Sequence, residues 1–338
     1  MQKLKDINFS LWCDFIEREF LESDFKDMIK KGIVNGATSN PAIFKEAFLN
    51  SSAYKEDIKD LKDKSPKEIY ETLAIKDIKR AATIMDDIHK QNSNDGFISI
   101  EIDPLLCDDY ENSLKEAKRL YESIGMDNVM IKVPATDAGY KVMRDLMAVG
   151  INVNATLVFS LDQAKKIVDA FKEGIEEFQK VDLDKTNPKG VISIFVSRFD
   201  RKLNSLLKEK SIKQNIVGIY NATKIYNYIE KNCSNYPIRA LFASTGVKGD
   251  DLKKDYYIKA LLYKNAINTA PLNAIEYFLK NDDLTIIDAK SDQEIDKFLD
   301  SLAKNQIDLN KVSDELLQEG LEAFKIAFAQ ILKELEKG

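Results

Sequence analysis

The chain has 338 residues, of which 44% are hydrophobic and 31% charged, so its composition is that of a folded globular protein and excludes an intrinsically disordered one. The 50 basic and 56 acidic residues give a net charge of −6, which argues against nucleic acid or an anionic membrane as a partner. No apolar run approaches the ~20 residues of a membrane-spanning helix, and the N-terminal segment lacks a signal-peptide pattern, so a cytoplasmic location is expected.

Short apolar runs alternate with amphipathic stretches along the chain. Eight runs are predicted to be strands: residues 9–14, 33–39, 97–103, 128–134, 151–158, 191–197, 238–244 and 266–270. Because helical patterns lie between most of them, the strands are expected to pair in parallel and to close into an α/β barrel, the (β/α)8 or TIM barrel. An open doubly wound sheet is the alternative. Residues 1–338 are expected to form one domain, with 291–336 as additional C-terminal helices (291–304 and 310–336) that could cross one end of the barrel.

Three of the predicted helices have clear signals in the sequence. A helical pattern through residues 110–124 stops at Gly125, and another begins after Thr136. Ser160 and Gln163 have the spacing of a capping box at the start of a third helix. The apolar face of that third helix consists of Ala164, Ile167, Val168 and Phe171.

Polar and apolar residues alternate within two of the predicted strands. In 97–103 one face carries Ile98, Ile100 and Ile102, and the other carries Phe97, Ser99, Glu101 and Asp103. In 151–157 one face carries Ile151, Val153, Ala155 and Leu157, and the other carries Asn152, Asn154 and Thr156. A half-exposed antiparallel sheet would show the same pattern, but intervening helices should cover the outside of a parallel sheet. The polar faces are therefore expected to line the interior of the barrel.

The chain has three cysteines and one histidine, which are too few for several kinds of metal or catalytic site. Cys13, Cys107 and Cys233 form no CxxC pair, and their wide spacing favours buried free thiols over a disulfide framework. His89 lies in a polar stretch typical of a helix end, where a surface position is expected. Neither a zinc site nor a Ser-His-Asp triad is expected, and no glycine-rich nucleotide motif occurs. Acid–base chemistry would have to come from carboxylates, lysine or tyrosine.

Charged residues near the predicted carboxyl ends of strands are the candidates for chemistry, because barrel enzymes keep their active sites at that face. They are Asp14, Glu101, Lys132 and Arg198. Lys132 stands inside an apolar run, and lysine is rarely buried without a partner. A lysine in an apolar pocket loses its proton more readily, and the neutral amine forms Schiff bases with carbonyl compounds. The alternative is an edge-strand lysine whose amine reaches solvent.

Six segments resemble the motifs of a known family, and they occur in that family's order. They are LWCD (11–14), GATSNPAIF (36–44), SIEIDP (99–104), IKVPATDAGYKVMRDLMAVGINVNATLVFS (131–160), ISIFVSR (192–198) and ASTGVK (243–248). Over at least residues 9–270 the chain resembles the bacterial transaldolases, which are class I aldolase-type (β/α)8 barrels of the pentose phosphate pathway.

The resemblance implies roles for four catalytic residues. Lys132 matches the Schiff-base lysine, and Asp14 matches the carboxylate that takes the C4-hydroxyl proton as the C3–C4 bond breaks. Glu101 matches a carboxylate that moves protons through a water molecule, which Thr156 would position. Without the resemblance, Asp14 would be interpreted as the N-cap of the following helix and Glu101 as an ion-paired barrel carboxylate.

The resemblance also implies how a substrate is held. Asn40 and Asn154 match side chains that bind the dihydroxyacetone hydroxyls. Their alternatives are a turn before Pro41 and an ordinary hydrogen bond inside the barrel.

Three further residues match the family's phosphate site: Ser193, Arg198 and Ser244. Arginine suits bidentate phosphate contacts. Some family members carry an arginine two residues after the last serine; Gly246 stands there in this chain, and Lys248 is the candidate to supply the charge.

The expected activity is transfer of a dihydroxyacetone unit between sugar phosphates, without metal or cofactor. A plain fructose 6-phosphate-type aldolase on the same scaffold is one alternative, and a non-catalytic sugar-phosphate-binding barrel is another. Sugar phosphates are the expected partners, and the protein is expected to be a monomer or a homodimer.

Overall fold

Eight parallel strands pair in sequence order and close into a barrel in the computed structural model, which describes residues 2–181, 186–280 and 284–337. The predicted (β/α)8 fold is therefore confirmed, and the open-sheet alternative is wrong. The strands are β1 (Ser10–Cys13), β2 (Gly36–Thr38), β3 (Phe97–Glu101), β4 (Val129–Pro134), β5 (Asn152–Val158), β6 (Gly190–Phe195), β7 (Ile238–Ala243) and β8 (Ile267–Ala270).

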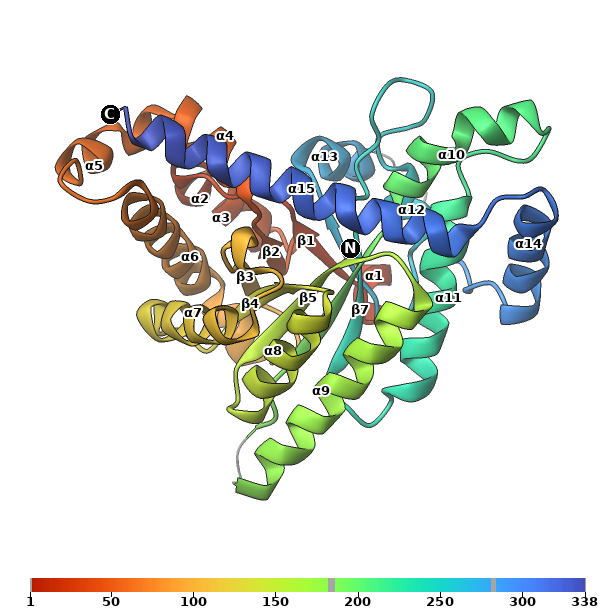
Figure 1. Cartoon of the computed structure of the whole chain (residues 1–338), viewed down its shortest axis with the longest axis horizontal. Helices are drawn as coiled ribbons and strands as arrows, with labels where there is room; N and C mark the ends of the chain where they lie inside the picture. Colours follow the sequence, from red (N-terminus) through yellow and green to blue (C-terminus); the bar gives the residue numbers. More distant parts are fainter. Residues whose placement is uncertain (1, 182–185, 281–283, 338) are drawn as a thin grey trace.

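Helices surround the barrel, and a long one crosses the end at which the strands finish (Figure 1). The helices before β6 are α1 (Gln2–Asp6), α2 (Arg18–Glu22), α3 (Asp24–Lys30), α4 (Pro41–Asn50), α5 (Lys55–Asp60), α6 (Pro66–Gln91), α7 (Tyr110–Ile124), α8 (Asp137–Ala148) and α9 (Leu161–Val181). Those after β6 are α10 (Ser197–Glu209), α11 (Val217–Asn232), α12 (Tyr256–Ala260), α13 (Leu272–Leu279), α14 (Asp292–Lys304) and α15 (Leu309–Leu335). Short 3-10 helices cover Ser52–Tyr54 and Pro104–Leu106.

Local signals place the helix ends where the sequence predicts them. Gly125 ends α7 in the left-handed conformation at φ 63°. The Thr136 hydroxyl accepts a hydrogen bond from the Gly139 amide and caps α8. At the start of α9 the Gln163 amide donates to the Ser160 hydroxyl, and the Gln163 side chain accepts from the Ser160 amide.

Two expectations about strand faces are wrong, because the chain leaves the regular alternation near the strand ends. β3 stops at Glu101, so Asp103 does not share its inner face; it caps the following 3-10 helix and pairs with Lys67 at 2.6 Å. In β5 the register to β6 shifts after Ala155, and Leu157 takes φ 57°. This bulge turns Leu157 away from the outer face and into the cluster that packs inside the barrel end.

Large apolar side chains fill the lower part of the barrel. Trp12, Phe97 and Met130 are buried there in one cluster. Gly36 makes room for the indole, because a Cβ at this position would lie 2.4 Å from the Trp12 ring. Ser99 on β3 and Asn154 on β5, from the two polar faces that the sequence pattern predicts, are buried and hydrogen-bonded to each other.

The cysteines and the histidine have structural positions. All three cysteines are buried free thiols, as predicted. His89 is partly exposed at the end of α6, where its ring packs on Phe97 and its Nδ1 lies 2.8 Å from the Asp95 carbonyl.

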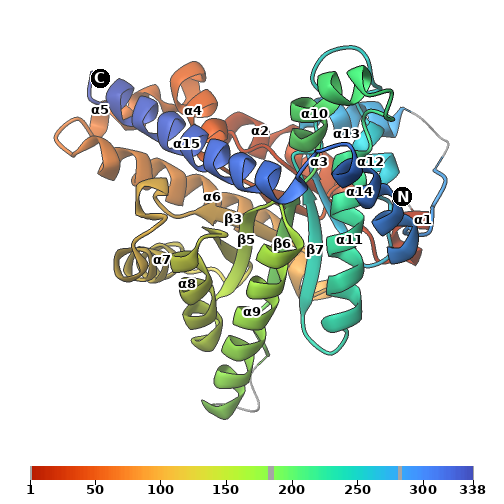
Figure 2. The ribbon, with the colours of Figure 1, turned by 45° about the vertical axis from the view of Figure 1, so that its right-hand side comes forward.

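The C-terminal helices α14 and α15 are present, as predicted. Figures 1 and 2 both show α15 running from the α14 side across the barrel end to the region of α4 and α5. It packs against α4, α6, α10 and β5. Among the described residues, no helix combines the length and apolar character that crossing a bilayer requires.

Candidate active site

A cavity of about 120 Å³ opens at the carboxyl ends of the strands, under α15. The predicted site residues that line it are Asp14, Asn40, Lys132, Ser193, Arg198 and Ser244. The remaining lining residues are Thr38, Phe195, Ala243, Thr269 and Phe324. The barrel thus brings together side chains that are far apart in the sequence.

Lys132 points into the barrel and is only 5% exposed. Its Nζ donates a hydrogen bond to the Ser39 carbonyl at 3.2 Å and lies 3.5 Å from Glu101 Oε2. The ring of Phe324 on α15 covers it, with Nζ 5.8 Å from the ring centroid. An edge-strand lysine that reaches solvent does not fit this position.

Glu101 is placed beside Lys132 by the pairing of β3 with β4, in which these two residues are direct neighbours. Burial raises the pKa of Glu101 to about 7, although the Lys132 ammonium acts in the opposite direction. Glu101 Oε2 is buried and has no hydrogen-bond partner within the described part of the chain. A carboxyl with this pKa can both give and take a proton near neutral pH.

Asn154 and Thr156 are fully buried on β5, where Asn154 pairs with Lys132, and neither lines the cavity. Thr156 is fully buried, and its hydroxyl oxygen has no hydrogen-bond partner among the residues described. Asn154 donates to the Ser99 hydroxyl at 2.9 Å and accepts from the Ser193 hydroxyl at 2.7 Å. The orphaned oxygens of Thr156 and Glu101 each need a hydrogen-bond partner from outside the described protein atoms, a need that a water molecule can meet.

Asp14 follows β1 and lies at the cavity wall. Its Oδ1 accepts a hydrogen bond from the Thr38 hydroxyl at 2.6 Å. Burial raises the pKa of Asp14, while the charge of Lys132 and the bond from Thr38 act in the opposite direction. The N-cap alternative for Asp14 is wrong, because Glu17 caps α2.

Asn40 lines the cavity and also caps a helix. Its side-chain oxygen accepts from the Ile43 amide and caps α4, with Pro41 as the first helical residue. Because the cap uses the oxygen, the amide nitrogen is the atom that Asn40 offers to the cavity.

The opposite wall of the cavity is cationic. Arg198 lies in the first turn of α10 and is half-buried over the Phe195 ring, 5.0 Å from its centroid. Burial and the nearby Arg201 lower the pKa of Arg198, and no carboxylate of the described residues forms an ion pair with it. Ser244 takes φ 55° and holds its Oγ 3.2 Å from the hydroxyl of Ser197.

Lys248 lies apart from this wall. It is exposed in the loop after β7 and does not line the cavity. Gly246, which precedes it, stays half-buried beside Pro271. The cavity therefore has Arg198 as its cation next to Ser244.

Sequence reasoning missed three lining residues that matter for the geometry. Thr38 stands in the same motif as Asn40 but was not singled out. Thr269 belongs to a short strand with a weak pattern, and Phe324 belongs to a helix whose docking place has no local signal. The position of Phe324 follows only from the packing of α15 across the barrel.

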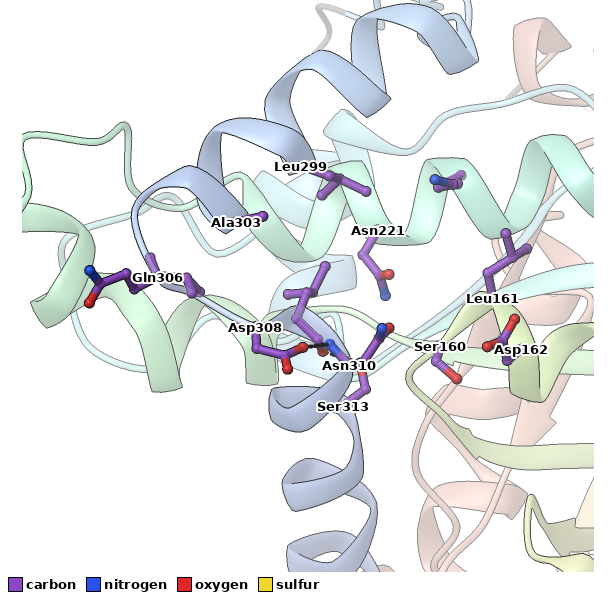
Figure 3. A pocket seen from close by; sticks show the side chains of 13 residues that line it. Ser160, Leu161, Asp162, Asn221, Leu299, Ala303, Gln306, Asp308, Asn310 and Ser313 are labelled. Atoms are coloured by element: carbon purple, nitrogen blue, oxygen red, sulfur yellow. Dashed lines mark hydrogen bonds between the residues drawn. The ribbon is translucent and has the colours of Figure 1, made fainter.

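A larger cavity of about 570 Å³ lies outside the barrel, where α14 turns into α15 (Figure 3). Its wall includes Asn221 and Ser313, which both donate to the Phe159 carbonyl behind the end of β5. None of the predicted site residues lines it. Among the residues described, no three His, Cys, Asp or Glu side chains are grouped as metal ligands.

Comparisons with known proteins agree over nearly the whole chain. A family model described as Transaldolase/Fructose-6-phosphate aldolase matches residues 11–335. A protein of Campylobacter jejuni (strain RM1221) named Transaldolase is 54% identical over 334 residues, which cover 97% of this chain and 99% of the relative. One of Helicobacter pylori (strain P12) with the same name is 46% identical over 325 residues, covering 96% and 98%.

Proposed function

The chain belongs to the transaldolase/fructose-6-phosphate aldolase family, and from that premise we propose that Lys132 forms a Schiff base with the carbonyl carbon of a ketose phosphate. The activity is that of a transaldolase, named as such in the near-full-length relatives. A dihydroxyacetone unit passes from sedoheptulose 7-phosphate to glyceraldehyde 3-phosphate and leaves erythrose 4-phosphate and fructose 6-phosphate. The reaction belongs to the non-oxidative pentose phosphate pathway.

Lys132 and Glu101, the buried pair inside the barrel, carry out the formation of the imine. The neutral amine of Lys132 adds to the C2 carbonyl to give a carbinolamine, which then loses its hydroxyl group as water. Glu101 supplies and accepts the protons of these steps through a water molecule held by Thr156. Support comes from the 3.5 Å between Lys132 Nζ and Glu101 Oε2 and from the two orphaned oxygens.

Cleavage and transfer use the carboxylate on the wall. Asp14 takes the proton of the C4 hydroxyl as the C3–C4 bond breaks, and the bond electrons move into the iminium to give an enamine. The aldose phosphate leaves. The enamine then attacks the aldehyde carbon of the acceptor, and Asp14 returns its proton to the new hydroxyl. Asn40 and Asn154 orient the dihydroxyacetone unit.

The phosphate group is held at the far wall, by Arg198 together with Ser193 and Ser244. Support comes from the Arg198 guanidinium at the cavity, which forms no ion pair within the described ranges of the chain, and from the start of α10 beside it. Binding the remote phosphate orients the small reacting centre over Lys132. Lys248 would reach the phosphate only if the loop after β7 moved inward.

The observation that carries the residue roles is that Lys132 and Asp14 line one cavity with Arg198. The test follows release of glyceraldehyde 3-phosphate from fructose 6-phosphate with and without erythrose 4-phosphate. Sustained release only with the acceptor is expected, because the enamine waits for an aldehyde. Equal release without acceptor would indicate an aldolase, and no release in either case would indicate a binding protein.

A further inference from the structure

A chain of hydrogen bonds joins Asp14 to a residue that has no part in the steps above. Thr38 Oγ1 lies 2.6 Å from Asp14 Oδ1 and 2.7 Å from Thr269 Oγ1. Thr38 is on β2 and Thr269 on β8, the two strands that flank β1, so the chain spans the end of β1. Both threonines are buried and line the cavity that contains Lys132.

The number of protons fixes the direction of each bond in this chain. An ionised carboxylate only accepts hydrogen bonds, and a threonine hydroxyl carries one proton. While Asp14 is ionised, Thr38 donates to Asp14 Oδ1, so Thr269 must donate to Thr38. The oxygen of Thr269 then presents lone pairs, and no proton, to whatever occupies the cavity.

We propose that Thr269 positions Asp14 through Thr38 and that its oxygen accepts a hydrogen bond from a hydroxyl group of the ketose. The inference rests on the proposed role of Asp14 and deepens it. With Oδ1 held by Thr38, Oδ2 is the carboxylate oxygen left to take the C4-hydroxyl proton. The hydrogen bond that Thr269 donates polarises the Thr38 hydroxyl. It thereby strengthens the hydrogen bond that Thr38 donates to the Asp14 carboxylate.

Loss of the Thr269 hydroxyl should therefore disfavour the ionised form of Asp14. At low pH Asp14 is protonated and cannot take the C4-hydroxyl proton, so kcat falls. Loss of the Thr269 hydroxyl should move this acid limb of the kcat profile to higher pH. The other charged or titratable groups that face Asp14 or line its cavity are Lys132 on β4, Glu101 on β3, the adjacent Cys13 and Arg198 on α10. None of them is altered by a substitution at Thr269.

The test compares Thr269→Val with Thr269→Ser. Valine keeps the shape and removes the hydroxyl, so kcat should fall about 10-fold and the acid limb should move to higher pH. Serine should restore both. Thr223→Val is the matched control: this buried hydroxyl bonds to the Ile219 carbonyl within α11, remote from the cavity, and wild-type kcat is expected. Wild-type kcat and pH profile in Thr269→Val, or an equal loss in Thr269→Ser, would overturn the proposal.

Two further measurements complete the test. At saturating fructose 6-phosphate, borohydride trapping of Lys132 should give the same yield in Thr269→Val as in wild type, because imine formation does not use Asp14. Failure of the wild type to be trapped would instead be a failure of the proposed function. In a Thr38→Val background the chain is already broken, so adding Thr269→Val should raise KM several-fold through the lost substrate contact. An unchanged KM would overturn that contact.

Discussion

At the scale of single residues, the pair formed by Glu101 and Lys132 carries two opposing effects. The neighbouring ammonium favours the carboxylate, and burial disfavours it. Burial dominates, so the pKa of Glu101 is raised to about 7. The raised pKa brings proton gain and loss by Glu101 close to neutral pH, which suits a residue that must give and take a proton within one turnover.

The raised pKa of Glu101 predicts a pH dependence of stability. Its ordinary pKa is near 4.5, so folding binds protons between pH 4.5 and 7, and the free energy of unfolding falls as pH rises through this window. The loss is nearly complete at about pH 8 and amounts to about 3 kcal/mol. Denaturant unfolding at pH 5 and pH 8 should show a smaller fall in Glu101→Gln than in wild type.

The exposed Glu111 on α7 offers the matched control, since Glu111→Gln should leave the pH dependence of unfolding as in wild type. If Glu101→Gln loses as much stability between pH 5 and pH 8 as the wild type does, the raised pKa is contradicted.

The position of Arg198 predicts that its substitution affects KM for phosphorylated substrates more than for unphosphorylated ones. Arg198→Met removes the guanidinium at the cavity wall, and KM for fructose 6-phosphate should rise about 10- to 100-fold. The cleavage of unphosphorylated fructose should change little, because the reacting centre is untouched. Arg119→Met on the exposed side of α7, where Arg119 pairs with Glu71, is the control. Equal losses on both substrates would contradict a phosphate contact.

At the scale of elements, the sequence predicts helix ends and strand existence well, because their signals are local. Gly125, Thr136 and Ser160 each act within one helical turn. The errors at Asp103 and Leu157 occur where a strand ends or bulges, and a period-2 pattern does not reveal such a point. Both errors lie next to the active site, where the chain must leave regular structure.

Helix α15 shows what an amphipathic pattern leaves open. The pattern predicts a helix over 310–336, but not the surface on which it packs. In the structure α15 crosses the barrel end (Figure 2). Phe324 on α15 lies over Lys132, with its ring centroid 5.8 Å from Nζ. Residues near the C-terminus thus complete a cavity whose chemistry comes from the strands.

Phe324 predicts the balance between transfer and hydrolysis. In Phe324→Ala the cover over Lys132 is lost and water reaches the enamine, which it can protonate. Release of glyceraldehyde 3-phosphate from fructose 6-phosphate without acceptor should therefore rise several-fold relative to transfer. Ile326→Ala, at an exposed position on the same helix, is the control. A ratio equal to that of wild type would show that Phe324 does not exclude water.

At the scale of the whole molecule, one end of the barrel carries the candidate active site and the other end contributes to stability. The carboxyl ends of the strands carry the cavity, and the opposite end is closed by Arg239. Its guanidinium donates to the Ser10 hydroxyl at 2.8 Å and to the Asn265 carbonyl at 2.8 Å, and lies 3.5 Å from Asp95. The alternation of strand and helix patterns along the sequence predicts the barrel. The closure by Arg239 joins residues that are far apart in the sequence, so it has no local signal.

The position of Arg239 predicts that its substitution lowers the free energy of unfolding but leaves kcat unchanged. Arg239→Met removes a partly buried ion pair and the hydrogen bonds to Ser10 and to the Asn265 carbonyl, so the free energy of unfolding should fall by about 2–3 kcal/mol. The kcat of the remaining folded protein at 25 °C should equal that of wild type, because the active site is at the other end. Denaturant unfolding and initial rates measure the two quantities. A loss of kcat without a loss of stability would contradict the division.

The central claim is that Lys132 bonds covalently to the substrate, and borohydride reduction in the presence of fructose 6-phosphate tests it most directly. The intact mass should increase by one reduced dihydroxyacetone unit or one reduced sugar phosphate, and peptide mapping should place the adduct on Lys132. Lys132→Arg should keep its fold, gain no mass and have no turnover. A wild-type protein without an adduct, or an adduct on another lysine, would contradict the account.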